Sequence, residues 1–579
     1  MRIPRRGTVA TAVLAAFLFL FAGRALAATE TWDGGCGPDA SWSCANNWSG
    51  DIVPGAEDRV IFDSTSTANS TVDPSFAGEV TRMDINSGYT GTVTLAEPLA
   101  VSSLFTQSAG AFTAAGQELT LGALTLSGGS FTASSGTTSV SKNLTISGSP
   151  TFNANNGTLN FNGKTATLAC DGQAFHLVTF THANGSKTVG SDCTLPLGSN
   201  PTISGEAAAL SMNGTLSGSG VLTIAESAGR LTIGSTGALS GFSGLALKSL
   251  AVNGATANFG SYKSFAIGKA FIQTGGTVTV PAKAAFQGPF EVNAGSTFNA
   301  PSGTISFENR FNLDSASTFN ANEGTVNFTG TQGGGITCGN QTFHRVTFTH
   351  SGNNRLVASD CTLPLGYSPV IGSGAYGGIS LSGTLTGTGT LKTATGASLI
   401  LNEGYGLEGF EKLQPSGLSI NSGTADLSAY TAVTASEALL VKAGATLVAP
   451  VRLNILGDMT VEPEGTFEPG LGQVVLNGSE QTISGDITFN DLIKHATTED
   501  TLTFSAGDTQ TINGSLSLNG KSTELLLNLV SSVPGTPWLV DAKGTTSVRY
   551  ASVADSTSIG PVIPAHNSVD AGGNTGWTF

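Results

Sequence analysis

The sequence predicts an all-β fold, namely a parallel β-solenoid with capped ends. Three observations predict it. A block of about 167 residues occurs twice, short alternating runs recur about every 20 residues inside each block, and almost no segment has the period of an amphipathic helix. Together they predict one elongated body built from many similar turns of chain.

The long repeat can be read directly from the letters. Residues 151–161 (TFNANNGTLNF) match residues 318–328 (TFNANEGTVNF), and SDCTLPLG occurs at both 191–198 and 359–366. A third, shorter and more diverged copy begins near residue 431 and contains no cysteine. Such self-similarity is typical of repeat architectures, in which each unit buries its apolar face only against its neighbours.

The short period predicts strands and turns. Runs such as LTISGSPTFNANNGTLNF (residues 144–161) alternate apolar and polar residues, and Gly, Asn and Ser separate the runs. Many short strands also fit a β-sandwich, but a rung of about 20 residues favours a solenoid whose strands stack in parallel about 4.8 Å apart. Inward Leu, Ile, Val and Phe then form a continuous core, while Asn and Thr line the turns.

The tryptophans predict where the solenoid is capped, because open sheet edges invite aggregation unless they are covered. All five lie near the chain ends, at Trp32, Trp42, Trp48, Trp538 and Trp577. We therefore divide the chain into a signal peptide (1–27), an N-terminal cap segment (28–98), two solenoid repeats (99–264 and 265–430), a diverged third repeat (431–520), and terminal rungs with a C-terminal cap (521–579).

The first 27 residues predict export. Arg2, Arg5 and Arg6 form a positive region, residues 9–22 are apolar, and Ala25-Leu26-Ala27 fits a signal-peptidase site. The alternative, an uncleaved membrane anchor, is disfavoured because the apolar run is shorter than a bilayer requires. We expect a secreted or cell-surface protein without a membrane span after cleavage.

Composition excludes some classes of partner. The net charge is -15, only 11% of residues are charged, and 77 are glycine. Nucleic acid and anionic lipid are bound through basic patches, so neither is an expected partner.

Six cysteines in an exported chain predict three disulfides. Among the possible pairings, the internal repeat selects Cys36–Cys44, Cys170–Cys193 and Cys338–Cys361. The alternative is a metal site, which needs ligands more closely clustered than these.

Several segments resemble a known class of protein. Residues 31–63 (TWDGGCGPDASWSCANNWSGDIVPGAEDRVIFD), the body units of the type GTFNANNGTLNFNG, and the ending at 548–579 resemble secreted bacterial β-helix surface proteins, akin to autotransporter passengers and filamentous adhesins. The resemblance implies a right-handed β-helix of bacterial origin. Unlike autotransporters, the chain is expected to have no C-terminal barrel domain, and therefore no anchor of that kind.

Histidines form one candidate site. His176 and His182 recur as His344 and His350. A spacing of six on a strand places both rings of a pair on one face, but about 20 Å apart, which is too far to share a metal ion. We therefore expect them at strand ends near the disulfide loops.

Acidic residues form two more candidate sites. Asp192 and Asp360 precede the second cysteine of each loop and fit either a cation site or, as we expect, turn hydrogen bonds. Calcium is the one cofactor considered, and its candidates are the N-terminal acids Asp51, Glu57, Asp58 and Asp63. The sequence contains no EF-hand or Gly-rich nonapeptide calcium motif.

The N-terminal tryptophans are the last candidates. Trp32, Trp42 and Trp48 fit either a sugar-stacking platform or a small aromatic core, and we favour the core. Catalytic residues are not predicted, because acids are scattered singly and no hydrolase, metalloprotease or P-loop motif occurs.

These expectations converge on a structural, surface or adhesin-like protein that acts as a rod-shaped display or attachment module. Its partner is expected to be a glycan, a cell surface or further copies of itself, and the two disulfide loops are the expected contact face. The alternative is a β-helix that binds or cleaves carbohydrate, as a lyase or hydrolase. Fold alone does not decide between them.

Overall fold

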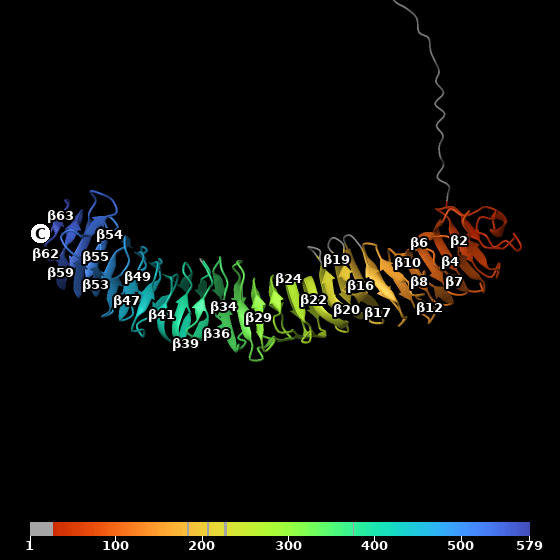
Figure 1. Ribbon diagram of the computed structural model, residues 1–579, viewed down its shortest axis with the longest axis horizontal. Helices are drawn as coiled ribbons and strands as arrows, with labels where there is room; N and C mark the ends of the chain where they lie inside the picture. Colours follow the sequence, from red (N-terminus) through yellow and green to blue (C-terminus); the bar gives the residue numbers. More distant parts are fainter. Residues whose placement is uncertain (1–26, 182–184, 205–207, 225–228, 375) are drawn as a thin grey trace, which may run out of the picture. The chain divides into compact units, whose positions relative to one another are not determined.

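The computed structural model of the protein describes residues 27–181, 185–204, 208–224, 229–374 and 376–579. The predicted signal peptide, apart from its last residue, lies outside the described residues. In that described part the structure is almost entirely β, with one short 3-10 helix, η1 (Ala45–Asn47). Successive strands stack in parallel as the coils of a β-solenoid, which confirms the predicted fold class (Figure 1).

The chain forms two compact units. The first contains the residues up to Val140 together with Ile146–Thr158, and the second contains Ser141–Thr145 and Leu159–Phe579. The division therefore falls inside the first of the two duplicated blocks. No helix in the described ranges is long and apolar enough to cross a membrane.

In the first unit, phenylalanines of neighbouring parallel strands stack on one another. Phe112 lies beside Phe131 and Phe131 beside Phe152, with ring centroids 5.2 and 5.8 Å apart. In-register parallel pairing places equivalent side chains on top of one another, so a repeated inward Phe becomes a stack of rings. The strands of this unit are β1 (Thr29–Thr31), β2 (Arg59–Phe62), β3 (Ser70–Val72), β4 (Glu79–Ile85), β5 (Thr92–Leu95), β6 (Leu99–Gln107), β7 (Ala111–Thr113), β8 (Leu119–Leu126), β9 (Ser130–Thr132), β10 (Thr137–Val140) and β12 (Thr151–Asn153).

The second unit shows the coil most clearly in the second repeat. One coil contains β27 (Phe290–Val292), β28 (Ser296–Asn299) and β29 (Thr304–Phe307), and the next contains β30 (Phe311–Leu313), β31 (Thr318–Asn320) and β32 (Thr325–Phe328). Each strand pairs in parallel with the strand one coil later. The phenylalanine of each strand points inward and is at most 4% exposed, so each of the three faces contributes to one core.

Outward residues of the same strands form polar columns. Thr297 lies beside Thr318, and Asn299 lies beside Asn320. The Asn320 amide donates to Oδ1 of Asn299 at 2.7 Å, and the Asn299 amide donates to Oγ1 of Thr279 at 3.0 Å. The repeated TFN letters therefore encode an inward ring flanked by two outward columns, and the polar groups of the Asn column bind one another along the stack.

The turns that follow these strands explain the next letters of the motif. Asn155 and Asn322 adopt φ values of 50° and 47°, a region that asparagine tolerates better than most residues. The Asn155 amide donates to the Ala133 carbonyl of the preceding coil, and the Asn322 amide donates to Ala300. Each asparagine thus shapes its own turn and joins it to the coil before it.

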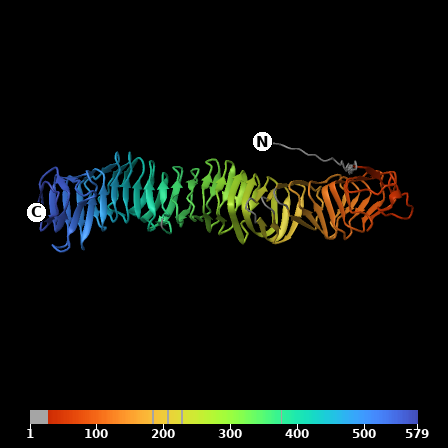
Figure 2. The same cartoon turned by 90° about the horizontal axis from the view of Figure 1, so that it is seen from above.

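A long sheet runs along the second unit, and the stacking of its strands can also be seen from above in Figure 2. Its strands are β36 (Thr362–Tyr367), β39 (Thr384–Thr393), β41 (Gly406–Gln414), β44 (Val433–Ala435), β47 (Arg452–Ile455), β50 (Gln473–Leu476), β53 (Asp491–His495), β56 (Ser515–Asn519), β59 (Thr545–Arg549), β62 (Ile563–His566) and β64 (Trp577–Thr578), with β37 (Val370–Ile371) also beside β39.

The structure confirms the predicted pairing of all six cysteines. Cys170 follows β14 (Ala166–Ala169), and Cys193 precedes β17 (Thr194–Ser199). Their disulfide, like the one between Cys338 and Cys361, joins one coil to the next.

Replacing both Cys338 and Cys361 by alanine is expected to lower the local free energy of unfolding by about 3 kcal/mol, because the disulfide closes a loop with a sequence separation of 23. Alanine replacement of Cys170 and Cys193 should cost the same, since their separation is also 23. Chemical denaturation of the oxidised proteins measures both values. Equal stability of variant and parent would contradict the expectation.

Candidate functional site

A hollow of about 450 Å³ lies beside the Cys338–Cys361 disulfide in the second repeat. Three parts of the chain form it: the segment after β33 (Gly335–Thr337), the segment after β35 (Arg355–Val357), and the strands β36 and β39. Its lining residues are mostly polar: Asn340, Gln341, Thr342, Phe343, Ser359, Asp360, Thr362, Pro364 and Thr386.

Hydrogen bonds hold the polar lining in place. Oδ2 of Asp360 accepts from the backbone N–H groups of Cys338 and Gly339, at 3.0 and 2.6 Å. The Gln341 amide donates to the Ser317 carbonyl at 3.0 Å, and its oxygen accepts from the Phe319 N–H at 3.1 Å. Both side chains are therefore fixed before any ligand arrives.

One aromatic ring borders the hollow. Phe343 is half-buried, and its ring centroid lies 5.4 Å from that of Phe319 and 6.2 Å from that of Phe311. Packing against the core rings holds it at the surface.

A second hollow of about 200 Å³ follows along the same strand. Thr362 and Pro364 of β36 line the first hollow, whereas Leu365 and Tyr367 line the second. The other wall of the second hollow is β34 (Arg345–Phe348). We call the two hollows together the β36 groove. The strand that both hollows follow has six residues, which span roughly 20 Å.

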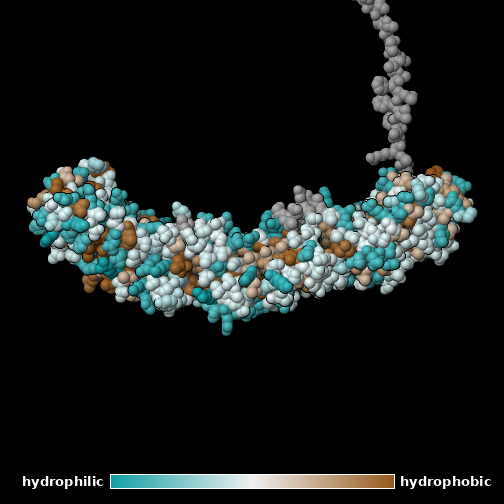
Figure 3. Space-filling model, in the orientation of Figure 1, coloured by the Kyte–Doolittle hydropathy of each residue, from teal (hydrophilic) through white to brown (hydrophobic). Residues whose placement is uncertain are grey.

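Tyr367 is the most prominent residue of this groove, since it is 80% exposed. Its ring lies directly over Gly389, where an added Cβ would be 3.0 Å from the tyrosine ring. Gly389 has a φ of 74° and no side chain, so it lets the ring lie against the backbone with its other face toward solvent. On the face of the molecule in Figure 3, hydrophobic patches are small and separated by hydrophilic and neutral residues.

The first repeat has the same frame but a different lining. Asp192 accepts from the N–H groups of Cys170 and Asp171, both at 2.7 Å, as Asp360 does in the second repeat. Both aspartates therefore bind the backbone of the preceding coil, 21 or 22 residues earlier, and these bonds are not the local turn hydrogen bonds that we expected. The lining differs at seven positions, where the first repeat has other residues: Gly172, Ala174, Leu177, Ser199, Asn200, Thr202 and Ser217 stand in place of Asn340, Thr342, Arg345, Tyr367, Ser368, Val370 and Thr386.

The histidines of the second repeat lie at the two ends of β34, as expected, but their rings do not share a face. His350 is fully buried, whereas His344 is exposed, so the two rings of the second pair do not share a face. The reason is that β34 begins at Arg345, which leaves His344 outside the alternation. In the first pair His176 is described, and His182 lies outside the described residues.

The environment of His350 predicts that the stability of the second repeat depends on pH. Its Nε2 is 2.8 Å from the Gly378 carbonyl, and burial, together with the charge of Arg355, lowers the pKa of the ring. The unfolded chain therefore takes up a proton near pH 6.5 that the folded chain does not, so stability is lost as the pH falls through that range.

His350→Gln retains a donor for Gly378 and is expected to lose less stability than the parent between pH 7.5 and 5. Urea midpoints at both pH values measure the difference. The matched control is His344→Gln at the exposed position, which should follow the parent. Identical pH dependence in all three proteins would contradict this role for His350.

The predicted calcium candidates are not gathered into a site. Asp58 accepts the Ala28 and Gly55 N–H groups, at 2.7 and 2.8 Å, and Asp63 accepts the Thr65 N–H. Asp51 and Glu57 are exposed. Among the described residues, no group of three or more His, Cys, Asp or Glu side chains could hold a metal ion. The acids instead bind backbone donors at turns.

The N-terminal tryptophans form an aromatic core. Trp32, Trp42 and Trp48 are all 0% exposed, and Trp48 packs edge to face against both of the others at 5.2 Å. A sugar cannot stack on a buried ring, which corrects the platform alternative. At the other end, Trp538 stacks on Phe504 with centroids 3.8 Å apart.

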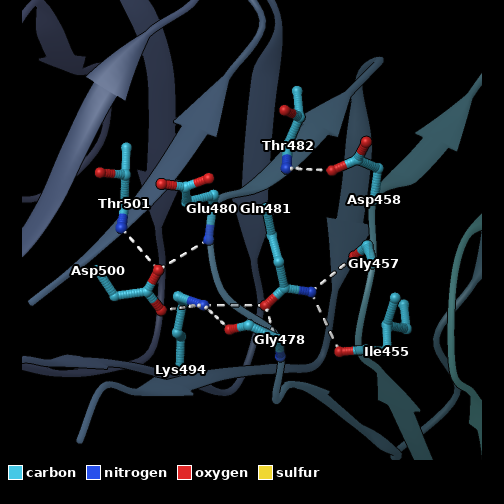
Figure 4. Close-up of polar contacts among 10 residues, drawn as sticks. All are labelled: Ile455, Gly457, Asp458, Gly478, Glu480, Gln481, Thr482, Lys494, Asp500 and Thr501. Carbon is cyan, nitrogen blue, oxygen red and sulfur yellow. Dashed lines mark hydrogen bonds and ion pairs between the residues drawn. The ribbon is translucent and has the colours of Figure 1, made fainter. Parts of the chain in front are cut away.

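A buried ionic network in the third repeat was not predicted from the sequence. Figure 4 shows Lys494 of β53 between Asp500 of β54 (Asp500–Phe504) and Gln481 of β51 (Gln481–Ser484). The ammonium group is 2.8 Å from Asp500, 2.9 Å from Gln481 Oε1 and 2.7 Å from the Gly478 carbonyl. The Lys494 and Asp500 side chains are only 1% and 7% exposed, so this network stabilises the interior and offers no binding surface.

Related buried cations occur in the other two repeats. Lys187 donates to the Gly163 carbonyl, and Arg355 donates to the Thr329 carbonyl. Gly163, Gly330 and Gly478 close the same turn of the three repeats, after TLNFN, TVNFT and QVVLN. Each repeat thus places a buried cation against the carbonyls of this turn. Lys187 and Arg355 stand at equivalent positions of the first two repeats, 168 residues apart, whereas Lys494 reaches the turn from a different strand position.

Chemically, the β36 groove can bind hydroxyl groups and one apolar ring face. Its first hollow has one carboxylate, Asp360, whereas glycoside hydrolysis uses two carboxyl groups across the scissile bond. The lining therefore fits recognition better than paired acid–base chemistry. Comparisons of the chain with protein-family models, with curated proteins and with solved structures gave no match.

Proposed function

We propose that this protein is an exported structural β-solenoid of the cell surface or its surroundings, which acts as a display or attachment module. The observation that carries the proposal is the in-register stacking of the TFN motifs, which produces continuous outward columns of Thr and Asn. The side chains of the Asn column are bound to one another, and disulfides join neighbouring coils in both repeats. Such a chain uses its length to build a stable lateral surface.

Three further observations support export and attachment. The N-terminal letters fit a signal peptide, the three disulfides fit an oxidising compartment, and the β36 groove lies beside one of the two loops expected to make contacts. The bacterial origin and the surface location belong to this proposal as expectations from the sequence resemblance.

Removal of a single coil tests attachment. Deletion of residues 338–361 removes about one coil of the second repeat, together with its disulfide and most of the first hollow, and the matched control deletes residues 298–318, one coil within the β28–β31 stack. Beads coated with parent protein are expected to attach to cells or to one another. We expect the first deletion to reduce attachment and the control to retain it, with both still folded by circular dichroism. Absence of attachment by the parent would overturn the proposal.

Fractionation tests export separately. The full chain is expected outside the cell and sensitive to added protease, and a chain without residues 1–27 is expected inside. Retention of the full chain in the cytoplasm would contradict export.

A further inference from the structure

The β36 groove differs between two otherwise equivalent repeats. Both repeats keep the disulfide and the aspartate that binds the preceding coil. The second repeat adds Asn340, Thr342 and Tyr367, where the first has Gly172, Ala174 and Ser199. Since the shared frame folds with either set, the added side chains are not needed for the coil itself.

The added side chains supply what a carbohydrate needs. Tyr367 offers an open ring face against which the apolar face of a sugar can pack, and Phe343 and Pro364 provide further apolar contact. Asn340 and Thr342 provide amide and hydroxyl groups for sugar hydroxyls. Oδ2 of Asp360 accepts from the N–H groups of Cys338 and Gly339, and its Oδ1 is the oxygen for a ligand hydroxyl.

Charge narrows the class of carbohydrate. Asp360 in the first hollow and Arg345 in the second are the charged residues of the lining, one of each sign. The whole chain carries a net charge of -15, which repels polyanions. A neutral glycan fits this groove better than a chain of uronic acids.

The shape of the β36 groove narrows the class of carbohydrate further. The two hollows, of about 450 and 200 Å³, follow one another along β36. Two hollows in series along one strand suit an extended oligosaccharide segment, whose successive sugar units can occupy them in turn.

We propose that the β36 groove of the second repeat binds a neutral oligosaccharide, with Tyr367 as the stacking ring and Asn340, Thr342 and Asp360 as hydroxyl partners. This inference rests on the proposed attachment function and names the chemistry of its partner. The first repeat has Ser199 at the position of Tyr367. It therefore keeps the disulfide and the aspartate but lacks the proposed sugar-binding residues.

The test replaces three lining residues of the second repeat by their counterparts in the first repeat. The variant Asn340→Gly, Thr342→Ala, Tyr367→Ser uses residues that the same frame already accommodates, and Gly172 has a positive φ of 68° where Asn340 has 58°. The matched control, Thr277→Ala, Thr297→Ala, Thr318→Ala, alters three outward threonines on another face. The probe is an array of neutral and uronic-acid hexasaccharides.

The parent and the control are expected to retain one or more neutral hexasaccharides, and the groove variant to bind them at least about tenfold more weakly. Circular dichroism and intact disulfides establish that all three proteins are folded. Retention of no neutral sugar, equal retention by the groove variant, or preference for uronic acids would each overturn the inference. Attachment that persists in the groove variant leaves the proposed function standing, whereas sugar binding without attachment overturns the function alone.

Discussion

Replacing Lys494 by methionine is expected to destabilise the third repeat by about 3–5 kcal/mol, because the Asp500 carboxylate then remains buried without its cation. Methionine keeps most of the volume of the lysine stem, so the change isolates the charge and its three hydrogen bonds. The Gly478 carbonyl also loses the lysine donor, and Gln481 Oε1 keeps only the Gly478 N–H. Unsatisfied buried acceptors add to the loss.

Peptide-resolved hydrogen exchange is the suitable measurement, since a single free energy of unfolding is poorly defined for a long repeat array. Peptides within residues 452–504 should lose protection, and peptides within 290–328 should keep it. The double variant Lys494→Met, Asp500→Asn removes both charges, while its new asparagine still accepts the Glu480 and Thr501 N–H groups. It is expected to recover much of the protection. A double variant as unstable as the single variant would show that volume, not charge, is responsible.

The coil could be predicted from the sequence because its information is local and repeated. Period-2 alternation places Phe298 and Phe319 inward, and the rung of about 20 residues places them one above the other. The disulfides followed from the long duplication, since Cys170–Cys193 and Cys338–Cys361 stand at equivalent positions. Each of these features depends on a residue type and a repeat, both of which are visible in the letters.

The groove and the buried cations depend instead on contacts between different parts of successive coils. Asp360 binds the backbone of residues 338 and 339, so its partners are N–H groups that no letter marks. Lys494 and Arg355 reach the same type of turn from different strands, which hides their equivalence from an alignment. For His350 the alternation was visible, but the strand boundary that separates it from His344 was not.

Replacing Arg355 by methionine is expected to destabilise the second repeat by at least about 3 kcal/mol, whereas Lys187→Met in the first repeat should cost no more than about 1 kcal/mol. The guanidinium donates to the carbonyls of Phe307, Glu308, Asn309 and Thr329, and so links β35 to two preceding coils. Lys187 donates to one carbonyl, that of Gly163. Three acceptors are left without a donor in the first case, because the Phe307 carbonyl keeps the Thr329 N–H, and one in the second.

The pH dependence of the two variants separates the contributions further. Desolvation lowers the pKa of Lys187 to about 8 and that of Arg355 to about 10. The folded first repeat therefore disfavours the lysine charge, and its stability should rise with pH from about 8 towards the pKa of an unfolded lysine, near 10.4. Lys187→Met should remove this rise. Urea unfolding followed by hydrogen exchange of each repeat, at pH 7 and pH 9.5, measures both effects. Equal losses in the two variants at pH 7 would show that burial of a cation, rather than the number of carbonyls it binds, determines the stability of this turn.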